Sequence, residues 1–93
     1  MNQFKLGVKT FQIQKFAESV ESVEVKRFLA EEGDFVNEDD EIIEFDSSKG
    51  STTQRIPESG KIVKFLVKLD EEYDVPCDYI ELDTDAKKGD NKN

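Results

Sequence analysis

Lys49 is the residue of this sequence whose surroundings best fit a covalent role. It lies in the polar run DSSKGS at 46–51, where Ser47, Ser48 and Gly50 surround it with small neighbours. A primary amine on a tight exposed turn can form an amide with a carboxylic acid, and small neighbours leave room for a long attached group. Most lysines in polar hairpins are simply solvated. The local sequence therefore suggests the chemistry, and the position of Lys49 in the whole chain has to support it.

The composition excludes most familiar catalytic chemistry. The chain has no histidine, and Cys77 is its one cysteine, which excludes an internal disulfide, a Cys/His zinc site and histidine-dependent triads. Acidic residues cluster at 31–34, 38–41 and 71–74, but their spacing does not fit a calcium loop of the EF-hand type. We interpret these clusters as solvated turns, and we expect neither a metal site nor an enzyme.

Size and charge favour a small module that binds other proteins. The 93 residues suffice for one domain, and 22 acidic against 13 basic residues give a net charge of −9. Such a surface suits neither nucleic acid nor anionic lipid and predicts a protein partner with a basic patch. The sequence has no apolar run long enough to cross a membrane, so we expect a soluble protein in a reducing compartment.

The first 17 residues admit two interpretations. They hold Lys5, Lys9 and Lys15 and no acid, which resembles the remnant of a mitochondrial targeting sequence and favours the matrix side of that organelle. Apolar residues at positions 4, 6, 8, 11 and 13 nevertheless follow the period of a strand, which predicts a sheet edge.

Short alternating segments separated by turn residues predict an all-β fold. The expected strands are 10–16, 23–30, 41–45, 52–56, 61–69 and 79–83, with turns at 31–34, 37–40, 57–60 and 70–72. No segment keeps a helical period. We expect the domain to cover residues 10–84, with an N-terminal extension at 1–9 and a polar C-terminal tail at 85–93.

The sequence matches itself after a shift of 37 positions. Residues 25–30 align with 62–67, and residues 42–46 align with 79–83, so the apolar positions stay in register without a gap. This repeat predicts two similar units related by a pseudo-twofold axis and packed as a flattened sandwich or barrel. Alternation and the repeat together assign six residues to the core: Phe28, Leu29, Ile43, Phe65, Leu66 and Ile80.

The repeat also locates Lys49. Its counterpart 37 residues later is Ala86, close to the end of the expected domain. Lys49 is therefore predicted to lie in the turn after the first unit, at the opposite end of the domain from the termini. That position suits a group that must reach other proteins.

Several of these segments resemble the lipoyl domains of 2-oxoacid dehydrogenase complexes. The matching segments are FAES at 16–19, EEGDFVNEDDEIIEFD at 31–46, Lys49, Pro57, GKI at 60–62 and FLVK at 65–68. The resemblance covers about residues 10–84 and is greatest to the succinyltransferase component of the 2-oxoglutarate dehydrogenase complex. It implies two quasi-symmetric four-stranded antiparallel sheets with a modified lysine on a hairpin.

The resemblance also implies a cofactor and a reaction cycle. In this family the lysine carries lipoic acid through an amide bond. The lipoyl arm takes an acyl group from a thiamine-dependent decarboxylase, delivers it to coenzyme A and is reoxidised by a flavoprotein. Lys49, flanked by Asp46, Ser47, Ser48 and Gly50, takes the place of that lysine, so the protein would present the arm while the cofactor supplies the chemistry. Biotin is less favoured, because biotin-carrying relatives flank their lysine with methionines and the one methionine here is Met1.

The sequence departs from the family pattern near the lysine and in the second unit. Ser48 replaces the acid that usually precedes the lysine, and the segment after Lys49 is polar, with Arg55 in place of a usual proline. Asp70 replaces the glycine of the second turn, which aspartate tolerates because it adopts left-handed conformations more readily than most residues.

Two functions of different classes therefore remain open. The first is an acyl carrier with lipoate on Lys49. The second is an unmodified accessory subunit with a structural or docking role in a larger mitochondrial assembly, for example a respiratory one. The altered flanks of Lys49 favour the second, as do a start at the chain's own Met and an end without a linker or an acyltransferase domain.

Overall fold

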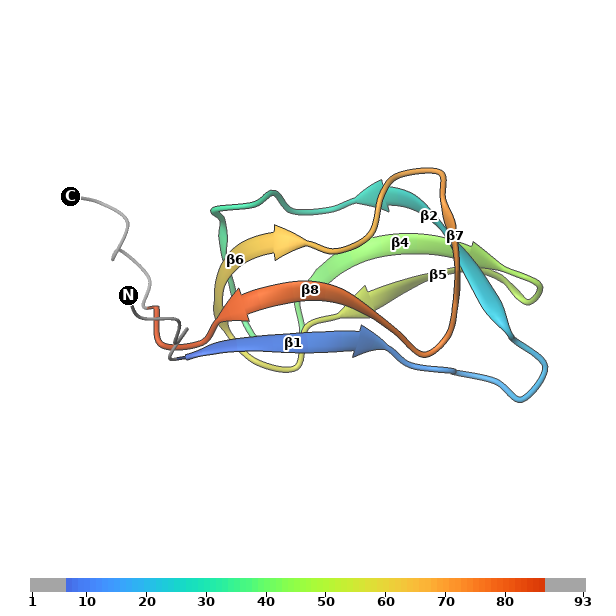
Figure 1. Ribbon diagram of the computed structural model, residues 1–93, viewed down its shortest axis with the longest axis horizontal. Coiled ribbons are helices and arrows are strands. Elements are labelled where there is room, and N and C mark those ends of the chain that lie inside the picture. Colours follow the sequence, from blue (N-terminus) through green and yellow to red (C-terminus); the bar gives the residue numbers. More distant parts are fainter. Residues whose placement is uncertain (1–6, 87–93) are drawn as a thin grey trace, which may run out of the picture.

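The computed structural model describes residues 7–86, and these residues form eight β-strands and no helix. The strands are β1 (Val8–Ile13), β2 (Ser22–Phe28), β3 (Phe35–Val36), β4 (Glu41–Ser47), β5 (Gly50–Arg55), β6 (Gly60–Phe65), β7 (Glu72–Asp74) and β8 (Cys77–Asp83). They build two antiparallel four-stranded sheets, with strand orders β1-β8-β6-β3 and β5-β4-β2-β7. The two sheets form a flattened sandwich that is not closed into a barrel (Figure 1), which confirms the predicted all-β class and the predicted pair of sheets.

The pairing register of the strands repeats between the two sheets. Val25 of β2 pairs with Phe45 of β4, and 37 positions later Ile62 of β6 pairs with Leu82 of β8. A bulge follows Val25 in β2, and a bulge follows Ile62 at the same place in β6. The outer strands also correspond, because β5 lies at the edge beside β4 as β1 lies at the edge beside β8. The sequence repeat is thus a true structural repeat.

The turns after β2 and β6 also correspond. The backbone N–H of Gly33 donates to the carbonyl of Ile62 at 2.8 Å, and the N–H of Asp70 donates to the carbonyl of Val25 at the same distance. Gly33 has a φ of +93°, and Asp70 has a φ of +64°. The aspartate therefore adopts the left-handed conformation that the turn needs, as predicted.

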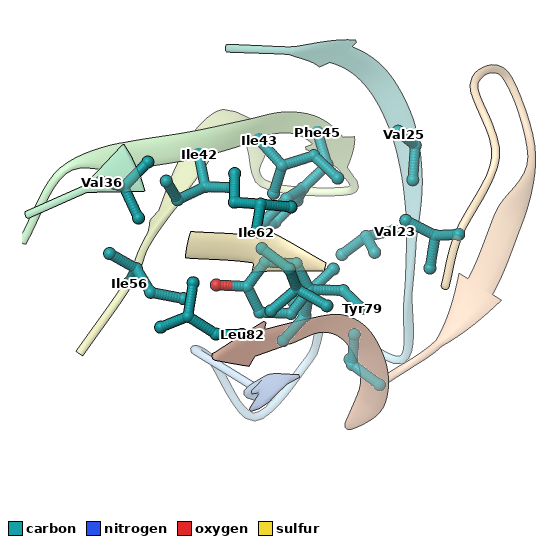
Figure 2. Close-up of a cluster of buried hydrophobic side chains, with 14 of the residues drawn as sticks. Val23, Val25, Val36, Ile42, Ile43, Phe45, Ile56, Ile62, Tyr79 and Leu82 are labelled. Carbon is teal, nitrogen blue, oxygen red and sulfur yellow. The ribbon is translucent and has the colours of Figure 1, made fainter. Parts of the chain in front are cut away.

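The core lies between the two sheets and is apolar, with branched residues of both units interleaved (Figure 2). Its largest fully buried side chains are Tyr79 and Phe45, followed by Ile13, Ile42, Ile43, Ile56, Ile62, Ile80 and Leu82. Strand alternation explains Ile43 with Phe45 and Ile80 with Leu82, because every second residue of a strand points to the same face. Ile42 and Tyr79 are buried beside them because each lies where the register with the edge strand shifts.

The predicted core is right for Ile43 and Ile80 and wrong for Leu29, whose side chain is 37% exposed. Leu29 follows the last residue of β2, where the chain leaves one sheet to form β3 in the other, so it has no sheet face to occupy. Leu66 has the same place after β6 and is half-buried. Phe28 and Phe65 are half-buried and pack on each other with ring centroids 4.4 Å apart.

Several strand boundaries differ from the predicted ones. β1 begins at Val8, two residues before the expected start of the domain, and β6 ends at Phe65 instead of residue 69. β3 and β7 were not expected, because strands of two and three residues are too short to show a period. β1 is an edge strand, which confirms the strand interpretation for positions 8–13, whereas positions 4 and 6 lie outside the described residues.

Candidate functional site

Lys49 lies at the tip of the hairpin that joins β4 and β5. In Figure 1 this hairpin is at one end of the sandwich, and the start of β1 and the end of β8 are at the other. The predicted separation of Lys49 from the two ends of the domain is therefore confirmed for the described residues. The segment that joins β1 to β2 lies at the same end as the hairpin.

The hairpin turn has a regular geometry that follows from its sequence. Ser47 and Gly50 are the last paired residues of the β4–β5 ladder, so Ser48 and Lys49 form the turn between them. Gly50 has a φ of +110°, while Ser48 and Lys49 are not among the residues with positive φ. This pattern matches a type I turn followed by a glycine in a left-handed conformation, which is common in hairpins. Gly50 thus enables the chain to turn sharply beside the lysine.

Side-chain hydroxyl groups reinforce this turn. The Ser47 Oγ accepts a hydrogen bond from the backbone N–H of Lys49 at 3.1 Å and donates one to the carbonyl of Gly50 at 3.2 Å. One pair further along the ladder, the Ser51 hydroxyl donates to Asp46 at 2.5 Å. Asp46 and Ser47 are half-buried at the base of the hairpin, whereas Ser48, Lys49 and Gly50 are exposed.

The side chain of Lys49 is exposed and has no ion-pair partner among residues 7–86. Other lysines of the domain are engaged, for example Lys9, whose Nζ lies 3.0 Å from Glu58. The amine of Lys49 is consequently accessible to an enzyme that would acylate it.

The polar residues after Lys49 fit their place in the sheet. β5 is an edge strand, and none of its six residues is fully buried. Arg55 lies 3.0 Å from the Glu41 carboxylate and donates to the backbone carbonyl of Asp39 at 3.0 Å. A polar edge strand that ends in a charged residue offers little apolar surface to a second chain, so the polar sequence is compatible with the fold.

A groove runs beside the hairpin, between the end of β4 and strands β2 and β7. Four of its lining residues are acidic, namely Glu21, Glu24, Asp46 and Glu72, and Ser47 and Ser48 of the hairpin also line it. Glu24 and Glu72 lie directly opposite each other in the β2–β7 ladder, an arrangement that like charges disfavour. Lys61 and Phe35 occupy the corresponding pair of the other sheet. The fold itself thus does not require two acids there.

The sequence predicted the residues of the hairpin and missed the groove. Asp46, Ser47, Ser48, Lys49 and Gly50 are contiguous, so a local pattern sufficed to bring them together. The groove joins residues that lie far apart in the sequence, such as Ser22 and Glu72, which are 50 positions apart and form a 2.6 Å side-chain hydrogen bond. The 37-residue repeat contains a signal that could have located the groove. β3 is equivalent to β7 and β6 is equivalent to β2, so pairing of β3 with β6 implies pairing of β7 with β2.

The described part of the chain offers no other site of a familiar kind. Within residues 7–86, no group of three or more His, Cys, Asp or Glu side chains is placed to hold a metal ion. Over the same residues, no helix is long and apolar enough to span a membrane.

A pseudo-symmetric sandwich of two four-stranded sheets with an exposed lysine on a terminal hairpin is the architecture of a carrier domain with a covalently attached arm. The family model described as "Biotin-requiring enzyme" (Biotin_lipoyl) matches residues 9–78. The chain therefore belongs to the family of biotin and lipoyl attachment domains, which carry a cofactor and do not themselves catalyse the reaction. None of the curated proteins compared with the chain matches it.

Membership in this family implies lipoate or biotin in amide linkage to a lysine. The residues present fit such a group, because Lys49 is exposed at the tip of a hydrogen-bonded turn and its neighbours Ser48 and Gly50 are small. The cofactor would supply the acyl or carboxyl chemistry. The protein would hold the attachment point away from the rest of the domain.

Proposed function

We propose that this domain is an acyl carrier of a 2-oxoacid dehydrogenase system, with lipoate attached to Lys49. The observation that carries the proposal is the exposed Lys49 on a hydrogen-bonded turn, with no ion-pair partner among residues 7–86, at the end of the domain opposite the start of β1 and the end of β8. A long arm on Lys49 can then visit other active sites while the chain ends attach elsewhere. The lack of methionine beside Lys49 and the similarity of FAES at 16–19 to succinyltransferase domains support lipoate and a 2-oxoglutarate dehydrogenase.

The proposal is tested by the mass of the protein isolated from its native source, with peptide mapping across Lys49. A lipoyl increment at Lys49 is the expected result, whereas a biotinyl increment would assign the domain to a carboxylase. A Lys49→Arg variant expressed in the same source should lose the increment. A Lys61→Arg variant is the matched control, because Lys61 lies on β6 and not on the hairpin, and it should keep the increment.

One observation favours the second candidate, an unmodified accessory subunit of a mitochondrial assembly. Ser48 stands where the family has an acid directly before the lysine, so the turn lacks a charge that attaching enzymes could recognise. Complete absence of modification at Lys49 in the native protein would favour this function. The protein should then co-purify with a larger assembly, and the Lys49→Arg variant should assemble as well as the natural chain.

The acidic groove supports a protein partner with a basic patch. Glu24 and Glu72 lie opposite each other in the β2–β7 ladder, and Asp46 adds a third acid at the base of the hairpin. Glu24 lies 3.7 Å from Lys26, and Glu72 accepts a hydrogen bond from Ser22, so the acids of the groove are only partly balanced. A positive surface would balance the remaining charge, and it would reach the groove and Lys49 together. Attraction of this kind acts mainly on the rate of association and weakens as salt screens the charges.

The partner proposal is tested with the lipoyl-loaded domain and the 2-oxoglutarate decarboxylase of the same source. The rate of acyl transfer should fall several-fold as ionic strength rises from about 0.01 to 0.5 M. The double variant Glu24→Gln/Glu72→Gln should slow transfer at low salt and flatten the salt dependence. A control that removes two exposed acids from the segments joining β2, β3 and β4, Glu31→Gln/Glu38→Gln, should change it less. A rate insensitive to salt would contradict the proposal.

The proposed location is the mitochondrial matrix side. The absence of acids from the first 17 residues and the presence of three lysines there support it. Protease protection of the native protein in isolated mitochondria, lost when the inner membrane is opened, is the expected result. Recovery of the protein in the cytosolic fraction would exclude this location.

A further inference from the structure

We infer that Ser47 is a positioning residue for the covalent loading of Lys49. The inference rests on the proposed carrier function and adds to it the side chain that fixes how the lysine is presented to the attaching enzyme. It follows from a comparison of the two ends of the pseudo-symmetric sandwich.

The Ser47 hydroxyl holds the backbone on both sides of Lys49. It accepts from the Lys49 N–H at 3.1 Å and donates to the Gly50 carbonyl at 3.2 Å. A hydroxyl has one donor and two acceptor positions, so both bonds form at once. The two bonds bracket the Cα atoms of Lys49 and Gly50 and thereby restrict the direction in which the Lys49 side chain leaves the turn.

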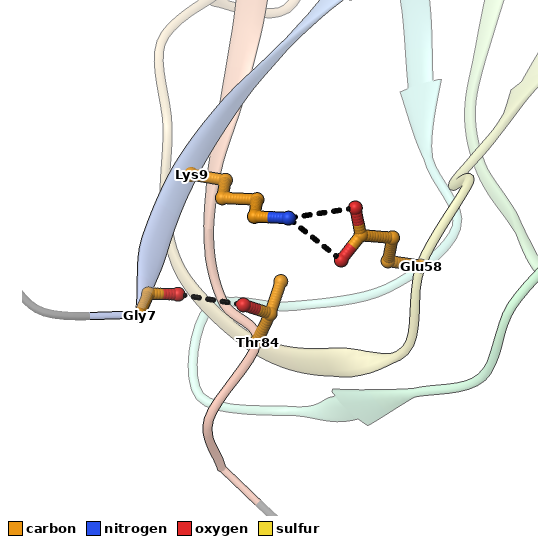
Figure 3. Close-up of polar contacts among 4 residues, drawn as sticks. All are labelled: Gly7, Lys9, Glu58 and Thr84. Atoms are coloured by element: carbon orange, nitrogen blue, oxygen red, sulfur yellow. Dashed lines mark hydrogen bonds and ion pairs between the residues drawn. The ribbon is translucent and has the colours of Figure 1, made fainter.

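The equivalent residues at the opposite end of the domain show which of the two Ser47 hydrogen bonds has a counterpart there. Thr84 is the counterpart of Ser47, and Gly7, with a φ of +82°, takes the place of Gly50. The Thr84 Oγ1 donates to the Gly7 carbonyl at 2.9 Å (Figure 3). Together with a 2.7 Å bond from the Thr84 backbone N–H to the same carbonyl, it joins the end of β8 to the start of β1, two segments that no turn connects. In the hairpin the chain itself makes the connection, so the same bond is not needed there to hold the strands together.

The second bond of Ser47 is specific to the lysine turn. The counterpart of Lys49 is Ala86, and the Ala86 N–H donates to the backbone carbonyl of Asp83 at 3.3 Å. Within residues 7–86, only the lysine turn thus has a side-chain hydroxyl holding the N–H at this position of the repeat. A bond that has no counterpart at the other end of the repeat, and that acts on the backbone of Lys49, points to a role in presentation.

The rate at which lipoate is attached to Lys49 depends on how the turn orients the amine toward the attaching enzyme. The attaching enzyme supplies lipoate as an acyl adenylate made from lipoate and ATP. The neutral amine of Lys49 forms a C–N bond to the carbonyl carbon, the C–O bond to the phosphate breaks, AMP leaves with the bonding pair, and the nitrogen releases a proton to a base. The amine must approach within about 3–3.5 Å along a suitable direction, so a turn with fewer conformations reaches this geometry more often.

The test measures loading of Lys49 by a purified lipoate–protein ligase with lipoate and ATP, followed by mass spectrometry of the whole chain. The variant Ser47→Ala should lower kcat/KM by roughly two- to tenfold, the factor that corresponds to one net hydrogen bond. Ser47→Thr should restore the natural rate, because threonine keeps a hydroxyl that can accept from the Lys49 N–H and donate to the Gly50 carbonyl. The matched control Thr84→Ala removes a hydroxyl far from Lys49 and should leave the loading rate unchanged.

A second measurement separates positioning from simple access to the amine. The small reagent succinimidyl acetate needs no defined approach from an enzyme, so it should acetylate Lys49 equally fast in the natural chain and in Ser47→Ala. Equal loading of the natural chain and Ser47→Ala by the ligase would overturn the inference and leave the carrier function standing. Equal slowing with both reagents would also overturn it. A natural chain that the ligase never loads at Lys49 would instead refute the proposed function, and the inference with it.

Discussion

Tyr79 and Ile42 occupy equivalent positions of the two units, 37 residues apart, and both side chains are fully buried in the core. The exchange places one phenolic hydroxyl in an interior that is otherwise lined by apolar side chains (Figure 2). Within the described residues 7–86, no hydrogen-bond partner reaches this Tyr79 hydroxyl. The two units therefore have equivalent backbones but different side chains in the core. The Tyr79 hydroxyl should affect the stability of the domain.

The variant Tyr79→Phe should be more stable than the natural chain. A buried hydroxyl without a partner has lost its hydration and gained nothing in return, so its removal should raise the free energy of unfolding by about 1 kcal/mol. Urea unfolding followed by circular dichroism provides the measurement. Tyr73→Phe is the matched control with the opposite sign, because the Tyr73 hydroxyl accepts a hydrogen bond from the Lys68 N–H at 2.9 Å and its loss should destabilise. Equal effects of both variants would contradict the argument.

Tyr79 should also make the domain sensitive to alkali. Burial raises the pKa of Tyr79 above its ordinary value of 10.0, so the folded chain keeps the phenolic proton at a pH where the unfolded chain releases it. Above that ordinary value the unfolded state binds fewer protons than the folded state, and stability falls as pH rises, by up to about 1.4 kcal/mol per pH unit. The free energy of unfolding, measured between pH 8 and 11, should fall less steeply in Tyr79→Phe. Identical slopes would refute this cause.

The internal repeat explains why much of the fold could be predicted from the sequence alone. A shift that keeps apolar residues in register over both units fixes which strands are equivalent, and pairs such as Val25 with Phe45 and Ile62 with Leu82 follow the same register. The prediction failed where a residue's place depends on the path between sheets. Leu29 has the sequence pattern of a core residue, but the chain crosses to the other sheet directly after Phe28.

The candidate site also has a part that the sequence predicts and a part that depends on the fold. The lysine and its small neighbours form one continuous hairpin, so their proximity required no knowledge of the fold. The pairing of Ser47 with both Lys49 and Gly50 depends on a rotamer that no sequence pattern specifies. The acidic groove depends on β7, a strand of three residues whose partner β2 lies far away in the sequence.

Gly60 should tolerate no side chain, although its counterpart in the first unit is Val23. A Cβ atom at Gly60 would lie 2.5 Å from the backbone carbonyl oxygen of Asp83 on the neighbouring strand β8. Backbone cannot move aside as a flexible side chain can, so Gly60→Ala should lower the free energy of unfolding by about 1–3 kcal/mol. Ser59→Ala, at the exposed neighbouring residue, is the control and should change it little. Thermal unfolding of both variants measures the difference, and equal stability would show that the two strands separate more easily than their contact implies.

Cys77 should react slowly with alkylating reagents at neutral pH. Burial raises the pKa of its thiol, and the neighbouring charges of Asp78 and Asp74 raise it further, so little of the reactive thiolate is present near pH 7. The rate of reaction with iodoacetamide, followed by mass spectrometry, should rise with pH to beyond the ordinary thiol value of 9.0. Asp78→Asn should move this profile to lower pH, because it removes one of the two charges. The unfolded chain in urea is the reference, and its thiol should react faster at pH 7.5. A native rate equal to that reference would mean that neither burial nor the two aspartates control the thiol.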